Sequence, residues 1–266
     1  MKNALVQTLD ALGRAIATGQ HPPGATLPPE PTLGATLGVS RTVVREAVKS
    51  LVAKGMLVTG PKVGTRVLPS DQWNWFDPEL VAWQGAAGLT RDFLRDLQEL
   101  RRIVEPAAVR LAAQRADAQD LAGLEAAYAG MRESIERGGD YVSHDLRFHQ
   151  GLMRASHNRM LVQMSKALGA LLRTSFEIST SRAQGPAQSL PLHRAVLDAV
   201  TQRRPADAER AIVELIDGAA EDIEHVLATR GELPSLALPP KPLAARSARA
   251  AASSRTNSSL SRRTLP

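Results

Sequence analysis

The strongest constraint on the fold is a long succession of helical apolar patterns, separated only by short glycine and proline breaks. Between residues 78 and 230, apolar side chains recur at steps of three and four, the spacing of one face of an α-helix. The expected helices cover residues 78–86, 90–115, 117–137, 140–157, 159–182, 189–203 and 205–229. Gly138-Gly139, Gly185-Pro186 and Pro205 mark breaks between them. Such closely spaced helices predict an antiparallel all-α bundle over residues 78–230.

The first 69 residues follow a different pattern, in which three short helices precede two β-prone runs. One face of the first helix carries Leu5, Leu9, Leu12 and Ile16. A second helix is expected at residues 31–37, with Gly38 at its end. Ser40 can cap a third helix, which Gly55 closes, and two short runs then flank a turn of Gly, Pro and Lys. This order predicts a winged helix-turn-helix domain at residues 1–69, and the fold class is mainly α.

Two further segments complete the expected organisation. Residues 70–77 form a linker that holds Trp73 and Trp75, and we expect these large rings to pack against the protein. Residues 231–266 are rich in Pro, Ser, Ala and Arg and have no apolar period. That composition is typical of a disordered tail.

Charge is distributed unevenly along the chain. Residues 1–70 carry eight Lys and Arg against three acids, whereas residues 71–230 carry nineteen against twenty-three. Residues 231–266 carry six against one, so the net charge of +6 belongs to the two ends. A small basic unit on a mildly acidic body predicts nucleic acid as the partner of the N-terminal end and another task for the body.

Other features of the composition exclude several classes of protein. The chain has no cysteine, which excludes disulfides, thiolate metal ligands and cysteine nucleophiles and fits a cytoplasmic location. No apolar run approaches the roughly 20 residues of a membrane-spanning helix. Asp10 and Arg14 interrupt the apolar pattern near the N-terminus, which favours a folded helix over a signal peptide.

The third helix has the composition of a DNA-reading helix. Ser40, Arg41 and Thr42 open it, and Arg45 and Lys49 follow on its outer face. In a major groove, Arg can pair with guanine, while Ser and Thr can hold phosphate. Lys62, at the tip of the expected wing, suits a phosphate or the minor groove. The simpler alternative is a solvated basic face on a small domain, but the winged helix-turn-helix order favours DNA binding.

Three helices of the body place polar residues where an apolar stripe is expected. Arg101 lies in the stripe from Leu94 to Leu111, and His193 shares its stripe with apolar residues. Asp145 and His149 share a face with Val142 and Leu152. Buried charges need partners or a ligand. We therefore expect these stripes to line a cavity.

An Asp and a His four residues apart can chelate a metal, and a His from a facing helix can add a third ligand. Asp145, His149 and His193 thus predict a divalent metal site, with zinc, nickel or manganese as the ion. Arg101 beside it favours an anionic ligand. In the alternative interpretation, Arg101 pairs with Glu105 or Glu99, and the Asp/His pair is only hydrogen-bonded.

The N-terminal segment ATLPPEPTLGATLGVSRTVVREAVKSLVAKGML resembles the DNA-binding domain of GntR-family bacterial transcription regulators. The Gly-Thr-Arg-Val of the wing adds to the resemblance. It implies a homodimer on a short palindromic operator, with Arg41, Thr42, Arg45 and the wing residues Lys62, Gly64 and Thr65 at the DNA. The chain departs from the family at Pro31, where an Arg is frequent.

The segments ELRRIVEPAAVRLAAQRA, DLRFHQGLMRASHNRML and LHRAVLDAV resemble the FCD effector domain of the FadR subfamily. The resemblance implies Asp145, His149 and His193 as metal ligands, with Leu215 in place of a frequent fourth His. It also implies Arg101 and Asn158 at the effector, with a structural role as the alternative for Asn158. The linker and the missing His are most similar to repressors of D-galactonate operons, which implies an aldonate effector.

These observations favour a ligand-responsive transcription repressor of sugar-acid catabolism. A related alternative is a regulator that responds to another small carboxylate, such as lactate or gluconate. A metal-dependent hydrolase or isomerase is a weaker alternative, because no spare base or nucleophile stands beside the ligands. An architectural DNA-binding protein that uses the basic tail would leave the acidic body without a role.

Overall fold

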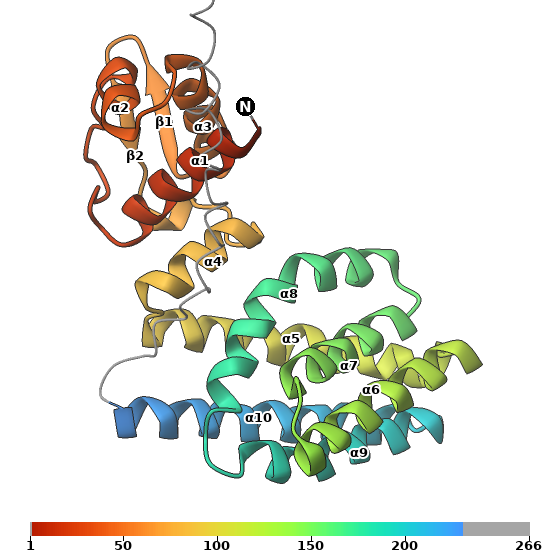
Figure 1. Cartoon of the computed structure of the whole chain (residues 1–266). Helices are drawn as coiled ribbons and strands as arrows, with labels where there is room; N and C mark the ends of the chain where they lie inside the picture. The colour runs from red at the N-terminus through yellow and green to blue at the C-terminus, as the bar shows by residue number, and fades with distance from the viewer. Residues whose placement is uncertain (1, 231–266) are drawn as a thin grey trace, which may run out of the picture. The chain divides into compact units, whose positions relative to one another are not determined.

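The computed structural model describes residues 2–230, and the expected disordered tail at 231–266 lies outside them. The N-terminal domain consists of α1 (Lys2–Ala17), α2 (Glu30–Leu37), α3 (Arg41–Ala53), β1 (Leu57–Gly60) and β2 (Gly64–Val67) (Figure 1). This is the winged helix-turn-helix order that the sequence predicts.

Local sequence explains where these elements begin and end. Gly38 ends α2 in the left-handed conformation, with a φ of 66° that glycine adopts without strain. The Ser40 hydroxyl accepts a hydrogen bond from the Val43 N–H and so caps α3. The strands pair antiparallel, with Leu57 opposite Val67. Inward-facing residues of α3 fill the domain core together with α1 and the strands.

The connection at 70–77 is packed down, as its tryptophans predict. It contains a short 3₁₀ helix, Ser70–Gln72. Trp73 is 8% exposed, and its indole N–H donates to the Leu68 carbonyl over 3.0 Å. A tryptophan buried with its N–H satisfied holds the chain in one course.

Helix α4 (Pro78–Ala87) contributes to two cores. Its Leu80 and Trp83 pack with the N-terminal domain, and the Trp83 indole donates to Asp10 over 2.8 Å. Val81 packs instead with the cluster that contains Phe176. The N-cap of α4, Asp77, forms an ion pair with Lys54 at the end of α3, with 2.6 Å between N and O. Helix α4 is therefore bonded to the DNA-binding domain and packed on the body.

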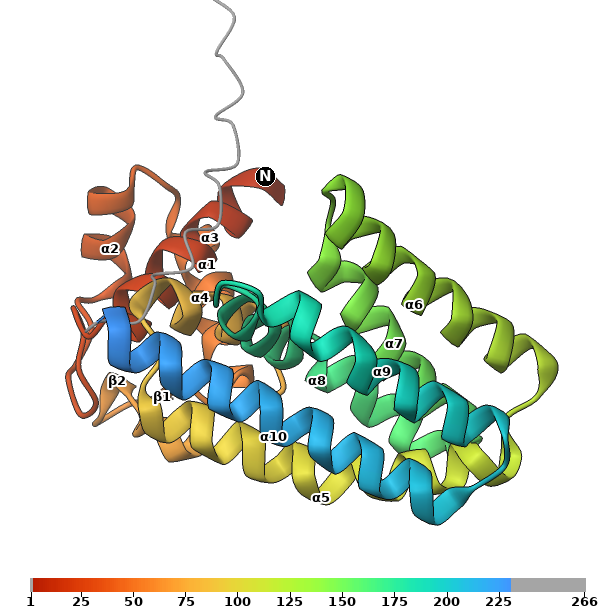
Figure 2. The same cartoon turned by 90° about the horizontal axis from the view of Figure 1, so that it is seen from below.

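The body consists of α5 (Arg91–Arg115), α6 (Ala118–Arg137), α7 (Tyr141–Ala155), α8 (Arg159–Ser179), α9 (Gly185–Thr201) and α10 (Pro205–Arg230). Figure 2 shows α5, α10 and α9 side by side, and α6 runs along α7. Apolar residues of α5, α6, α7, α9 and α10 form one core cluster, and α8 packs through separate clusters that contain Phe176 and Ile178. The described helices thus form the all-α bundle that was expected, and none of them is long and apolar enough to cross a membrane.

The sequence prediction was wrong about two helix ends, one on each side of the connection between α8 and α9. Helix α8 ends at Ser179 rather than at 182, and α9 begins at Gly185 rather than at 189. Gly185-Pro186 was interpreted as a break within a loop. Proline is tolerated in the first turn of a helix, where its missing N–H would have no helical partner. The residue with a left-handed backbone is Gln184, directly before α9, whose φ is 66°.

Candidate metal centre and nucleic-acid interface

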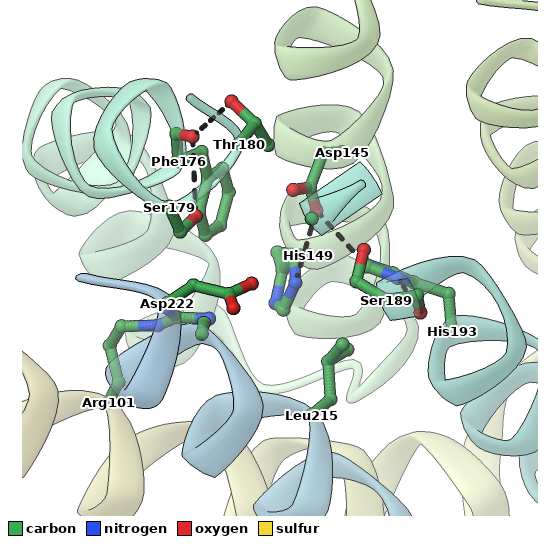
Figure 3. A pocket seen from close by; sticks show the side chains of 12 residues that line it. Arg101, Asp145, His149, Phe176, Ser179, Thr180, Ser189, His193, Leu215 and Asp222 are labelled. Atoms are coloured by element: carbon green, nitrogen blue, oxygen red, sulfur yellow. Dashed lines mark hydrogen bonds and ion pairs between the residues drawn. The ribbon is translucent and has the colours of Figure 1, made fainter. Parts of the chain in front are cut away.

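Three of the predicted site residues come together in the body of the protein. Helix α7 places Asp145 and His149 one turn apart on its buried face, and α9 supplies His193 (Figure 3). The His193 Nε2 lies 3.0 Å and the His149 Nε2 3.3 Å from the same oxygen, Asp145 Oδ1. Their ligand atoms lie within 4.8 Å of one another. The polar residues within the apolar faces of α7 and α9 therefore form one cluster.

The outer nitrogen of each histidine is bonded to a second acceptor. His149 Nδ1 lies 2.7 Å from Glu105 Oε2, and His193 Nδ1 lies 2.9 Å from the Ser189 carbonyl oxygen. An acceptor at Nδ1 fixes the ring so that Nε2 faces Asp145. Metal-binding histidines are oriented in the same way, so the donor set and its surroundings fit a divalent metal such as zinc, nickel or manganese.

Buried charge shifts the pKa values of this cluster. Burial alone would raise the pKa of Glu105, but Arg101 and His149 outweigh it and lower that pKa to about 2. Burial would lower the pKa of His149, yet Glu105 and Asp145 raise it to about 9. The two histidines likewise hold the pKa of Asp145 below its ordinary value, against its burial. A metal at His149 must therefore displace a proton.

Arg101 is 1% exposed, and its internal partner is Glu105. The Arg101 Nε donates to Glu105 Oε1 over 2.8 Å, and the guanidinium carbon lies 4.9 Å from the centroid of the Phe176 ring. The alternative in which Arg101 pairs with Glu105 is thus realised. Arg101 also lines the cavity, so the internal pair and a role at a ligand are compatible.

The cavity is small: its volume is about 20 Å³, room for an ion or a water molecule, so a larger ligand requires its walls to move apart. Leu215, at the position of the absent fourth His, is part of the wall. Seven further wall residues were not predicted from the sequence: Phe176, Ser179, Thr180, Gly185, Ser189, Ala219 and Asp222. They come from the end of α8 and from α9 and α10, and no local spacing connects them.

Asn158 does not lie among the residues that line the cavity. Its side chain is the N-cap of α8 and accepts from the Met160 N–H over 2.9 Å. The expectation that Asn158 contacts an effector is therefore corrected to a capping role, which is common for asparagine before a helix.

The predicted DNA-binding residues lie on the surface of the N-terminal domain. Arg41, Thr42, Arg45 and Lys49 are exposed on α3, whereas Val44 and Leu51 face the core. At the wing, Lys62 and Gly64 are exposed and Thr65 is half-buried. Gly64 has a φ of 69°, which explains the glycine at this turn. The expected basic face exists and is free of the protein core.

Arg41 makes one contact that the sequence analysis did not anticipate. Its Nε lies 3.3 Å from Glu30 Oε2 at the start of α2, although its side chain remains 72% exposed. An exposed pair of this kind contributes little to stability. Arg41 therefore stays available for another anionic partner.

Comparison with known families identifies the class of protein that carries these two sites. The gntR family of bacterial regulatory proteins matches residues 6–67, and the FCD domain matches residues 96–218. The chain belongs to the GntR family. Its body is the FCD effector domain of the FadR subfamily, so this GntR protein is a transcription regulator and not an enzyme. Members of the family bind operator DNA, and FCD domains bind small-molecule effectors.

Individual relatives agree with this assignment. The chain is 31% identical to the galactonate operon transcriptional repressor of Escherichia coli K12, over 81% of this chain and 94% of the relative. It is 34% identical to the uncharacterized regulator YieP of the same organism, over 76% and 87%. A solved structure of Lar, which controls expression of the Listeria monocytogenes agr system, has the same fold. Its TM-score is 0.60 at 18% identity, covering 83% of this chain and 96% of Lar.

Proposed function

We propose that this GntR regulator is a homodimeric repressor of sugar-acid catabolism, and that an aldonate such as D-galactonate releases it from a palindromic operator. The observation that carries the proposal is the convergence of Asp145, His149 and His193 beside Arg101 in a small cavity. The similarity to a galactonate operon repressor supports the effector class. A lactate-like acid or gluconate is the alternative effector.

In this proposal Asp145, His149 and His193 hold a divalent metal, with zinc preferred over nickel or manganese. When bound, the metal supplies a Lewis-acidic anchor for a carboxylate or hydroxyl oxygen. Arg101 adds a cation at the same wall, held in place by Glu105. Leu215 offers no fourth protein ligand, which leaves that side of the metal to the effector.

At the other end, Ser40, Arg41, Thr42, Arg45 and Lys49 contact one half-site of the operator in the cytoplasm. Lys62, Gly64 and Thr65 of the wing contact the DNA backbone or the minor groove. Their exposure on one domain supports this assignment. A homodimer presents two such domains to a palindrome.

Helix α4 offers a physical connection between the two sites. Phe176 lines the cavity and belongs to the same apolar cluster as Val81 of α4, and α4 is bonded to the DNA-binding domain through Trp83 and Asp77. An effector that binds two arrangements of this region with different affinity shifts the population toward one of them.

A thermal-shift panel tests the proposal. The acids are D-galactonate, D-gluconate and lactate, with a fatty acyl-CoA as a control, each with and without prior chelation. We expect an aldonate to raise the melting temperature, because binding to the folded state stabilises it, and chelation to abolish the shift. His193→Gln should abolish the shift as well, whereas His225→Gln, an exposed histidine of α10, should retain it.

The outcomes separate the parts of the proposal. A shift that survives chelation would keep the sensor and remove the metal from it. A shift with lactate alone would favour the alternative effector. No shift with any aldonate would overturn the sugar-acid assignment and leave a GntR regulator with another effector.

A further inference from the structure

The cavity is also lined by an acid that the proposed metal centre does not use. Asp222 of α10 is 8% exposed, and in Figure 3 its side chain points into the space between Arg101 and His149. Its Oδ1 forms an ion pair with Arg182, which lies in the connection between α8 and α9. The pair holds the Asp222 carboxylate in the wall of the cavity.

Gly185 keeps the second oxygen of Asp222 accessible. A Cβ atom at position 185 would lie 3.4 Å from Asp222 Oδ2 and 3.0 Å from the Ser179 carbonyl oxygen. Any larger residue would occupy the space beside this carboxylate. The first residue of α9 thus leaves an acceptor oxygen at the edge of the cavity.

Two hydroxyl groups that line the same cavity, those of Ser179 and Thr180, are also acceptors. Thr180 Oγ1 donates its proton to the Phe176 carbonyl over 2.6 Å, and Ser179 Oγ donates to the same oxygen over 3.3 Å. A hydroxyl has one proton to donate and two lone pairs that accept. Since both protons are engaged within the protein, a ligand meets lone pairs at Ser179, Thr180 and Asp222. This part of the wall suits a ligand that donates hydrogen bonds.

The charges of the cavity are nearly balanced in pairs. Arg101 is neutralised by Glu105, and Asp222 by Arg182. Asp145 then stands alone against the two charges of a divalent metal, which leaves a single positive charge. One carboxylate neutralises it. A second carboxylate would be an uncompensated charge beside Asp222, where like charges repel.

We propose that Asp222 makes the cavity selective for a polyhydroxy acid with one carboxylate, whose hydroxyl end donates to Asp222, Ser179 and Thr180. The inference rests on the proposed function, because it places the carboxylate end at the metal held by Asp145 and His193 and leaves the Asp222 side of the cavity to the hydroxyl end. The cavity therefore accepts aldonates and rejects aldarates, which carry a carboxylate at both ends. Asp222 is a specificity-determining residue of this site.

The test is titration calorimetry of the zinc-loaded full chain with two matched pairs of acids. D-galactonate and D-galactarate differ only in the terminal group, a hydroxymethyl or a carboxylate, and D-gluconate and D-glucarate form the second pair. We expect the native chain to bind one aldonate at least roughly tenfold more tightly than its aldarate, the factor that one hydrogen bond to a charged group can supply. Asp222→Asn should reduce this ratio to near one or reverse it, because the amide can donate to a carboxylate and Arg182 is freed.

Two further variants distinguish selectivity from a structural role of the ion pair. Arg182→Gln retains Asp222 and should keep or raise the preference for the aldonate. Glu221→Gln removes an exposed acid next to Asp222 and should leave the ratio unchanged. Circular dichroism checks that each variant is folded. If Asp222→Asn is unfolded, the ratio of aldonate to aldarate affinity in the native chain and in Arg182→Gln decides whether the cavity is selective.

Equal binding of aldonate and aldarate by the native chain would overturn the inference while the proposed function stands. The same holds if Asp222→Asn and Arg182→Gln weaken both acids by equal factors. Binding of neither pair by the native chain would overturn the proposed function and the inference with it.

Discussion

The basic face of α3 and the cavity of the body place their charged side chains in opposite environments. Arg41 and Arg45 come from one helix and are exposed, so water solvates them in the absence of a partner. Arg101, Glu105 and His149 come from two helices and are almost fully buried, so each requires the others. A site on a surface can change its residues without affecting the fold, whereas a buried site is part of the structure that holds the protein together.

The largest effect should follow from neutralising the shared acid of the cavity. Glu105→Gln leaves Arg101 buried without its anion and removes one of the two carboxylates that contact His149, and breaking such a buried pair costs about 3–5 kcal/mol. Urea unfolding of the metal-free chain measures the loss. Glu99→Gln, on the exposed side of the same helix, should change stability by less than about 0.5 kcal/mol. Similar values for the two variants would contradict the contrast between buried and exposed charge.

An intermediate effect is expected from pH. The pKa of His149 is raised from 6.5 to about 9, so its contribution to stability is complete below pH 6.5 and is lost as the pH rises to about 9. For the metal-free chain, the loss of unfolding free energy across this range should reach up to about 3 kcal/mol. His149→Gln should flatten the profile, while His225→Gln should follow the native one. If the unfolding free energy of the metal-free native chain does not change between pH 6.5 and about 9, the raised pKa of His149 is refuted.

The smallest effect on the fold should come from the DNA-binding face. Arg45→Ala should weaken binding to an operator selected from random DNA by about 1–3 kcal/mol, roughly tenfold to a hundredfold. The unfolding free energy should change by less than about 0.5 kcal/mol. Fluorescence anisotropy at one salt concentration measures the binding, with Arg132→Ala, on the exposed surface of α6, as the control. A large loss of unfolding free energy in Arg45→Ala would contradict the expectation that exposed charges contribute little to the fold.

The same difference explains what the sequence could predict. The winged domain follows from local signals, such as the Ser40 cap and the glycine at 38, and each acts within a few residues. Asp145 and His149 were also visible, because they share a helix face. Glu105 appeared only as a possible partner of Arg101. Its contact with His149 joins residues 44 positions apart, and no sequence pattern within either helix predicts this contact.

Asp222 and Arg182 were not anticipated at all. They are 40 positions apart, and each taken alone is an ordinary charged residue of a helix or a loop. Asn158 failed in the opposite direction, because the family pattern suggested an effector contact where a local cap was sufficient. Pairs across a bundle depend on how helices pack, which apolar periodicity does not specify.

The distribution of tryptophan has a spectroscopic consequence. The three tryptophans of the chain, Trp73, Trp75 and Trp83, all lie in the connection and in α4. The ring centroids of Trp73 and Trp75 lie 5.8 Å apart, and the Lys54 Nζ lies 5.8 Å from the centroid of the Trp83 ring. The chain's tryptophan fluorescence therefore originates at the junction, whereas the residues that line the cavity and those of α3 contribute none of it. A shift in the wavelength of tryptophan emission on adding an acid would therefore report, without an added dye, a structural change that extends from the cavity to the junction.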